Sequence, residues 1–487
     1  MIEMVRSQIF NGIRFGIDMA LLTLELQQNR ISPLYRQLYD FIKGEVRSGS
    51  LKAGEKLPSK RNLSTHLKIS QNTVETAYGQ LVAEGYIRSA ARSGFYVCSL
   101  EMPSLTTEMQ PVPIRSISDE IAKKTYKYDF RTNSIDTAYF PFATWARIQK
   151  EIMHEGNREL LNMPDPQGDH LLRESISKYL HEFRGVNCLP EQIVVGAGTE
   201  YLLGLIIQIL GRSCVWAIEN PGYSKTYLVL KNNGVKTNLT SLDDEGIRIS
   251  DLTTSDSNIV YITPSHHFPL GIIMPMHRRM QLLKWANDSD DRYIIEDDYD
   301  SEFRFNGRPI PALQGLDPND KVIYISTFSK SIAPSMRVSY VILPPKLLAK
   351  YRKEFSFYSS TVSRFEQHAL YKFMADGYFE RHLNRMRNIY RARKDKFVEE
   401  IKRLPFADKI EIIGENAGLH LLLKIHGEMK EKELLRRAEK VGVKLYGLSE
   451  YYLKPETDMP DNVVVLGYSK FTADEITDAV QSLKNAW

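Results

Sequence analysis

The chain has 487 residues, too many for one compact core, so its length alone indicates about three domains of ordinary size. Hydrophobic residues account for 43% and charged residues for 25%, as in soluble globular proteins, and the net charge of +4 excludes a polycation, so any nucleic-acid site must be a local patch. Three widely spaced cysteines and the lack of any apolar run near the roughly 20 residues of a membrane span predict a cytoplasmic protein with no metal site and no membrane partner.

Residues 1–30 are predicted to be an N-terminal extension rather than part of a folded domain. Residues 1–18 contain two arginines but no long apolar core and no cleavage-like site, so we expect no signal peptide. Met19 begins a more regular apolar run and looks like a more natural start. The preceding residues are interpreted either as an extension from an upstream start codon or as a disordered segment.

Three helical patterns followed by a two-stranded pattern predict a winged helix-turn-helix domain over residues 31–98. Pro33 suits the first turn of the first helix, Ser59 is the expected N-cap of the second, and Gly85 ends the third. The predicted helices and strands are, in order, Pro33–Val46, Ser59–Leu67, Gln71–Glu84, Tyr86–Arg88 and Gly94–Val97.

Residues 99–127 contain three prolines, several Ser and Thr and little periodicity, so they are predicted to be a stiff linker. From residue 128 onward, apolar strand-like runs alternate with helical ones, which predicts a mainly parallel sheet in an α/β domain. A smaller α+β part is expected from about Arg381, where a long basic helix begins and runs to Lys396. The predicted strands are Ile193–Val195, Cys214–Ile218, Asn258–Ile262, Tyr293–Ile295, Val322–Ile325, Gly418–Lys424 and Val463–Gly467.

The third predicted helix begins with residues that can read DNA. In helix-turn-helix proteins, the N-terminal residues of the second helix of the motif meet base edges in the major groove. Gln71 and Asn72 can bond adenine through two hydrogen bonds, and Thr73 can contact a thymine methyl or a phosphate. Any single cation nearby could equally be a solvated surface charge, but the set favours a site for a double-stranded operator. These cations are Lys60 and Arg61 before the turn and Arg88 and Arg92 beside the wing.

Residues 32–98 resemble the GntR family of winged-helix regulators. The motifs Pro58–Arg61, Asn72–Val74 and Leu81–Ile87 occur in the order typical of that family. The resemblance implies a DNA-binding transcription regulator. Many family members have Arg where this chain has Gln71, so the operator sequence cannot be transferred from relatives.

Lys330, at the end of the run Ser326–Lys330, and the acidic run Glu296–Asp298 each follow an apolar strand. A pyridoxal phosphate (PLP) site requires this pattern, because a lysine amine forms a Schiff base with the cofactor aldehyde and an aspartate keeps the pyridine nitrogen protonated. Adjacent strand residues point to opposite faces, so the three carboxylates compete for that second role. The sequence therefore predicts a PLP site at Lys330.

The C-terminal part, from about residue 128, resembles a fold-type I aminotransferase, and the chain as a whole resembles the MocR-type transcriptional regulators. The resemblance implies a PLP-binding domain over residues 128–487, made of a large α/β part and a small α+β part, and a homodimer packed head to tail. Within that group the chain looks closest to the GABA-responsive regulator. The motifs that carry the resemblance are Pro166–Gly168, Val195–Thr199, Glu219–Tyr223, Thr263–Pro269, Glu296–Phe303 and Thr327–Ser331.

The resemblance also assigns roles within the PLP site. It favours Asp297 as the partner of the pyridine nitrogen, with Tyr299 bonded to the 3′-oxygen and Tyr223 stacked on the ring, although core packing alone also explains a tyrosine at position 223. Gly198 and Thr199 precede an apolar helix, and backbone N–H groups at a helix N-terminus bind phosphate. The phosphate cup would be completed by Thr327, Ser329 and Arg337.

Four positions of the expected effector pocket depart from relatives. Aminotransferases carry an Asn that bonds the 3′-oxygen, whereas the corresponding residue here is Phe268, which puts efficient transamination in doubt. The two arginines that hold the GABA carboxylate align with Lys225 and Glu450, and a carboxylate at the second position would repel an acidic ligand. His267 is either a pocket residue or a structural histidine. We therefore predict that GABA is not the effector.

The sequence thus predicts a PLP-dependent regulator whose DNA binding changes with a small amino acid, an amine or PLP itself. An alternative is an active aminotransferase with a vestigial DNA-binding segment. A regulator that senses PLP to control vitamin B6 synthesis and a regulator of D-amino-acid or cell-wall precursor genes also remain open.

Overall fold

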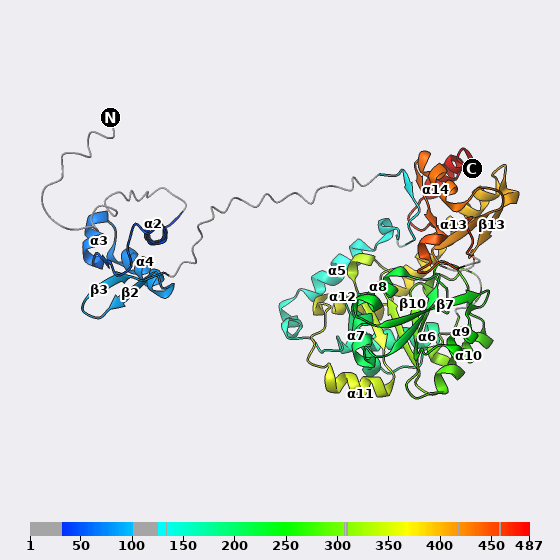
Figure 1. Ribbon diagram of the computed structural model, residues 1–487, viewed down its shortest axis with the longest axis horizontal. Coiled ribbons are helices and arrows are strands. Elements are labelled where there is room, and N and C mark those ends of the chain that lie inside the picture. Colours follow the sequence, from blue (N-terminus) through cyan, green and yellow to red (C-terminus); the bar gives the residue numbers. More distant parts are fainter. Residues whose placement is uncertain are drawn as a thin grey trace. The chain divides into compact units, whose positions relative to one another are not determined.

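The computed structural model describes residues 32–100 and 125–487, except for residues 133, 306, 308, 309, 416, 417, 457 and 458. The predicted N-terminal extension and most of the predicted linker lie outside the described residues. The chain divides between Lys123 and Lys124 into two compact units, here called the small unit and the large unit (Figure 1).

Over residues 32–100, the small unit is a winged helix-turn-helix fold with three helices, as predicted. The Ser59 hydroxyl accepts a hydrogen bond from the Asn62 amide at 3.2 Å, and the Ser70 hydroxyl accepts one from the Thr73 amide at 3.1 Å, so both helices of the motif begin at capped residues. The helices pack on a fully buried apolar core that includes Ile42. A two-residue strand, too short for a periodic pattern, joins the hairpin as its third strand. The elements are α2 (Leu34–Ser48), β1 (Lys56–Leu57), α3 (Lys60–Leu67), α4 (Gln71–Ala83), β2 (Ile87–Ala90) and β3 (Gly94–Val97), in the antiparallel sheet order β1-β3-β2.

The large unit is built on an eight-stranded sheet in the order β5-β12-β11-β10-β9-β6-β7-β8. The neighbouring strands from β11 to β7 pair in parallel. At the two ends, β12 is antiparallel to both of its neighbours and β8 is antiparallel to β7. The prediction of a mainly parallel sheet is therefore confirmed. The strands are β5 (Ile193–Gly196), β6 (Val215–Asn220), β7 (Lys236–Asp243), β8 (Gly246–Ile247), β9 (Ile259–Ile262), β10 (Tyr293–Asp298), β11 (Val322–Thr327) and β12 (Ser339–Ile342).

Helices cover both faces of this sheet. On β10, Ile295 packs in the apolar cluster that contains Leu202 and Ile206 of α7, whereas its neighbour Ile294 packs in the cluster with Leu282 of α10. Successive residues of β10 therefore face opposite sides of the sheet. The covering helices are α5 (Phe142–Ile152), α6 (His170–Arg184), α7 (Thr199–Leu210), α8 (Ser224–Asn232), α9 (Ile249–Thr254), α10 (Met276–Asn287), α11 (Pro345–Glu354) and α12 (Arg364–Ala375).

The C-terminal part of the large unit is α+β, as predicted (Figure 1). The predicted basic helix lies within α13 (Tyr378–Lys402), and an antiparallel sheet follows in the order β13-β14-β17-β16. The other elements are β13 (Ile410–Ile413), β14 (His420–Ile425), α14 (Glu431–Lys440), β16 (Tyr446–Gly447), β17 (Val463–Gly467), α15 (Ala473–Lys484) and the parallel pair of β4 (Tyr128–Asp129) with β15 (Val443–Lys444). Among the described helices, none combines the length and apolar character that a membrane span requires.

Candidate functional site

A cavity of about 200 Å³ lies at the carboxyl ends of the parallel strands β9, β10 and β11, where open α/β sheets place their ligands. The N-terminus of α7 forms part of its wall. The predicted site residues that line it are Thr199, Tyr223, Lys225, Phe268, Asp297, Tyr299, Thr327, Ser329, Lys330 and Arg337. Residues more than 130 positions apart in the chain are thus gathered around one cavity.

Lys330 lies three residues beyond the end of β11, and its ammonium donates a hydrogen bond to the Thr132 carbonyl at 2.7 Å. Burial lowers the pKa of Lys330 to about 8, although the negative charge of Asp300 acts in the opposite direction. A larger fraction of the amine is therefore neutral near pH 7 than for an exposed lysine. The neutral amine is the form that attacks a carbonyl.

Asp297 is the one of the three consecutive carboxylates that lines the cavity. Glu296 accepts hydrogen bonds from the backbone amides of Leu313 and Gln314, at 2.8 and 2.9 Å. Asp298 forms a salt bridge with Arg184 at 2.8 Å. This division follows the alternation of β10. Burial raises the pKa of Asp297 to about 7, and the Tyr261 hydroxyl donates to one of its oxygens. A cation placed beside Asp297 would favour its ionised form.

The start of α7 and the loop after β11 form a cup of hydrogen-bond donors. Gly198 has φ +98°, and a Cβ on it would lie 2.0 Å from an Arg337 nitrogen, so the glycine lets the guanidinium approach the helix N-terminus. Arg337 pairs there with Glu200 at 2.7 Å. The Thr327 and Ser329 hydroxyls are 2.8 Å apart on the same cup. Backbone amides, hydroxyls and a guanidinium at a helix N-terminus are a donor set that fits a phosphate group.

Aromatic rings form the remaining wall of the cavity. Tyr223 and Phe268 meet edge to face with centroids 5.7 Å apart, and Phe268 also contacts Tyr299 at 6.1 Å and Tyr451 at 5.2 Å. Phe268 is buried and offers no hydrogen bond to the cavity. The wall therefore suits a flat ring, with polar contacts supplied by other residues.

Three predicted site residues are not among those that line the cavity: Gly198, which lies beside Arg337, and the two effector-pocket residues His267 and Glu450. His267 is buried with Nε2 3.5 Å from Glu219, and burial lowers its pKa to about 3, so it behaves as a neutral structural histidine. Glu450 is exposed and turns back to accept from the Gly447 amide at 3.2 Å, which caps a short 3₁₀ turn. By contrast, Lys225 lines the cavity, with its ammonium 3.7 Å from Glu200.

The sequence reasoning missed Glu200 and Tyr261 as cavity residues. Glu200 follows Thr199 in the first turn of α7, so the prediction of a helix N-terminus at this point carried a signal for it. Tyr261 lies in the apolar run of β9. A tyrosine in an otherwise aliphatic buried strand indicates a nearby polar partner, because a buried hydroxyl needs a hydrogen bond.

The predicted DNA-reading residues gather on the small unit. Gln71 and Asn72 are exposed at the start of α4, whereas Thr73 is half-buried. The predicted cations lie on α3 and on the β2–β3 hairpin. On α3, Lys60 pairs with Glu75 at 2.5 Å and Arg61 is exposed. On the hairpin, Arg88 lies 5.3 Å from the Tyr96 ring centre, and Arg92 has φ +60° in the turn between β2 and β3.

Comparison with known proteins agrees with this division. Residues 127–456 match the aminotransferase class I and II family, and residues 34–97 match the bacterial regulatory proteins of the gntR family. The chain is 40% identical to the uncharacterized HTH-type transcriptional regulator YdeL of Bacillus subtilis (strain 168), over 93% of this chain and 97% of that one. It is 34% identical to the probable rhizopine catabolism regulatory protein MocR of Rhizobium meliloti, over 95% and 96%. Among solved structures, Pyrococcus horikoshii kynurenine aminotransferase is similar in fold, with a TM-score of 0.65 and 23% identity over 79% of this chain and 96% of that one.

Proposed function

The chain belongs to the MocR-type transcriptional regulators, in which a GntR-family helix-turn-helix domain is joined to an aminotransferase-like domain, and from this premise we propose that its cavity binds PLP at Lys330 and senses a small amino acid, an amine or PLP itself. When bound, PLP supplies an aldehyde that condenses with amines and a ring that withdraws electrons. The observation that carries the proposal is the convergence of a half-buried lysine of lowered pKa, a buried aspartate and a phosphate-type cup in one cavity.

Each wall of the cavity has one task in this proposal. Lys330 would present its neutral amine, and Asp297, which accepts a hydrogen bond from the Tyr261 hydroxyl, would hold the proton on the pyridine nitrogen. Tyr223 and Tyr299 line the cavity, where Tyr223 would pack on the ring and Tyr299 would donate to its 3′-oxygen. The phosphate would be held by the amides of Gly198 and Thr199 and by the side chains of Thr327, Ser329 and Arg337.

Regulation is favoured over turnover because of Phe268 and the small unit. Phe268 gives the 3′-oxygen no hydrogen bond, so transamination should be weak. The exposed Gln71 and Asn72 of the small unit remain available to read an operator. An effector that binds one arrangement of the protein better than another would then shift DNA binding.

This proposal relates the chain to the GABA-responsive regulator only as another member of the same family. Lys225 is in salt-bridge range of Glu200, so an acidic effector would meet a carboxylate close to the one predicted anchor that lines the cavity. Glu450 does not line the cavity, so it is not the carboxylate that would repel an acidic effector there. Glu200 does line the cavity and would repel such an effector. We keep the expectation that GABA is not the effector.

We also propose that the protein acts as a homodimer in the head-to-tail arrangement that the family resemblance implies. Two small units per dimer would read two operator half-sites, and the segment between the units would set their separation.

The direct test is an absorption titration of the purified full-length chain with PLP, followed by GABA, D- and L-alanine and other amino acids, beside Lys330→Ala. The proposal expects a visible band that Lys330→Ala abolishes and that one amine shifts without release of a keto acid. Steady keto-acid formation would instead indicate an aminotransferase. A wild-type protein with no Lys330-dependent band would refute PLP binding at this residue.

A further inference from the structure

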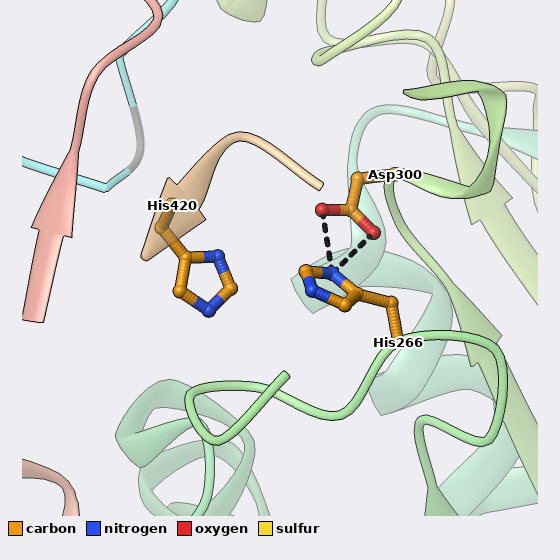
Figure 2. A group of neighbouring side chains, drawn as sticks. All are labelled: His266, Asp300 and His420. Atoms are coloured by element: carbon orange, nitrogen blue, oxygen red, sulfur yellow. Dashed lines mark hydrogen bonds and ion pairs between the residues drawn. The ribbon is translucent and has the colours of Figure 1, made fainter. Parts of the chain in front are cut away.

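Three buried side chains lie against the cavity wall and have no role in the function proposed above. His266, Asp300 and His420 come from the loop after β9, the loop after β10 and the start of β14 (Figure 2). The His266 Nδ1 atom lies 3.1 and 3.0 Å from the two oxygens of Asp300. The same nitrogen is 3.0 Å from the hydroxyl of Tyr299, which lines the cavity.

The loop that carries His266 is fixed from two sides. Arg184 donates to the hydroxyl of Ser265 at 2.7 Å. A Cβ on Gly418 would lie 1.9 Å from the His266 ring and 2.8 Å from Asp300, so only a glycine allows this backbone to cover the pair. The close packing leaves the imidazole no room to turn away from Asp300 and Tyr299.

The donor atoms of this group are of the kind that bind divalent cations, but their surroundings favour a hydrogen-bonded role. His420 is neutral, because burial lowers its pKa to about 3, and its Nε2 donates to the Pro269 carbonyl at 2.8 Å. Two guanidinium groups, those of Arg184 and Arg304, share a small cavity with His266 and Asp300. A divalent cation would meet their positive charge at short range.

The partners of His266 decide which of its nitrogens carries the proton. An ionised carboxylate only accepts hydrogen bonds, so Asp300 holds the proton on Nδ1. With its one hydrogen in place, Nδ1 cannot accept from Tyr299, so the Tyr299 oxygen can only share that hydrogen with Asp300 as an acceptor, and the hydrogen of the Tyr299 hydroxyl is free to point at an acceptor in the cavity. The Nε2 atom of His266 has no hydrogen-bond partner in the described part of the chain, which suits a bare lone pair better than a buried N–H.

We propose that His266, held by Asp300, is a positioning residue that turns the Tyr299 hydroxyl toward the 3′-oxygen of the cofactor and so substitutes for the hydrogen bond that Phe268 cannot make. The inference rests on the proposed PLP site. It gives a role to the contact between His266 and Asp300, because a hydroxyl whose hydrogen is turned away from Nδ1 is better oriented to donate into the cavity than one that donates to the imidazole.

The test follows the pH midpoint of the visible absorption band of the PLP-loaded full-length protein. A donor on the 3′-oxygen favours its anionic form, so losing that donor raises the midpoint. Tyr299→Phe and Asp300→Asn should each raise it, by up to about one pH unit, and the double variant should not exceed Tyr299→Phe alone. Removing the charge of Asp300 without an effect through Tyr299 would instead lower the midpoint, because that charge favours protonated Lys330.

A pair of His266 variants keeps the test decisive if Asp300→Asn fails to fold. His266→Asn retains an N–H close to the position of Nδ1 and should keep the midpoint near that of the wild type, whereas His266→Leu should raise it as Tyr299→Phe does. Equal midpoints for His266→Asn and His266→Leu, or a fall with Asp300→Asn, would overturn the proposal. If the wild-type protein shows no visible band beyond that of Lys330→Ala, PLP binding at Lys330 is refuted instead.

Discussion

The small unit and the cavity of the large unit place their polar residues in opposite environments. The residues expected to read DNA are mostly exposed, as at Gln71, Asn72 and Arg61, and depend little on one another. Around the cavity, buried and half-buried residues are linked, since Tyr261 bonds Asp297 and His266 contacts both Asp300 and Tyr299. Substitutions on the small unit should therefore change recognition alone, whereas those around the cavity should change stability, protonation and binding together.

The largest expected effect is on stability of the large unit. Arg184 and Asp298 form a buried pair at 2.8 Å beneath the cavity, and removing one partner leaves a buried charge, so Arg184→Ala should cost about 3–5 kcal/mol of unfolding free energy. The matched control is Arg36→Ala, because Arg36 pairs with Asp40 at 3.4 Å on the exposed face of the small unit and should cost under about 1 kcal/mol. Calorimetry of both variants checks this, and equal costs would break the comparison.

The next effect is the pH dependence of PLP capture by the cofactor-free protein. Lys330 has its pKa lowered to about 8, and only the neutral amine reacts, so the initial rate should rise about tenfold per pH unit up to pH 8 and level off above it. Stopped-flow absorbance from pH 6 to pH 9.5 measures this rise. A rate still rising about tenfold per pH unit at pH 9.5 would mean that burial does not lower the pKa of Lys330.

A smaller effect is expected at the DNA-reading helix. Asn72 is exposed at the start of α4 and, if it bonds a base through two hydrogen bonds, Asn72→Ala should weaken operator binding by about 1–3 kcal/mol. The PLP band and the thermal stability should be unchanged. Fluorescence anisotropy with operator and unrelated DNA separates a loss of specificity from a uniform loss. A change in the PLP band would show that the two units are not independent in this respect.

The smallest effect is expected at Glu200. This half-buried carboxylate pairs with Arg337 at 2.7 Å and would lie close to a phosphate in the cup, so Glu200→Gln should tighten PLP binding by about threefold. Equilibrium titration of the cofactor-free protein with PLP measures the change. Weaker binding would mean that Glu200 instead holds Arg337 in its productive position.

The fold could be predicted largely because local signals agreed with the final structure. Ser59 is the N-cap it was predicted to be, and the apolar runs at Ile259–Ile262 and Val322–Thr327 are buried central strands. β7 was missed because its residues are mostly half-buried and polar. β12 was also missed, although its four residues are all buried. Neither the antiparallel direction of β12 nor its place between β5 and β11 has a local sequence signal.

The candidate site could be predicted where it depends on motifs and alternation. The alternation of β10 separates Asp297 from its two acidic neighbours, as period-two reasoning requires. The position of Glu450 could not be predicted, because its preference for the Gly447 amide is set by a local turn. The contact of His266 with Asp300 joins residues from two loops, and no linear pattern records it.

The most direct test of the account is whether the cavity controls DNA binding through Lys330. DNA from the region upstream of the gene that encodes this chain would be titrated with wild-type and Lys330→Ala protein, each without PLP, with PLP, and with PLP plus the amine that shifts the absorption band. The account predicts that the amine changes the dissociation constant for DNA in the wild type and leaves it unchanged in Lys330→Ala. An equal response in both proteins, or no response to PLP or to any amine in the wild type, would contradict it.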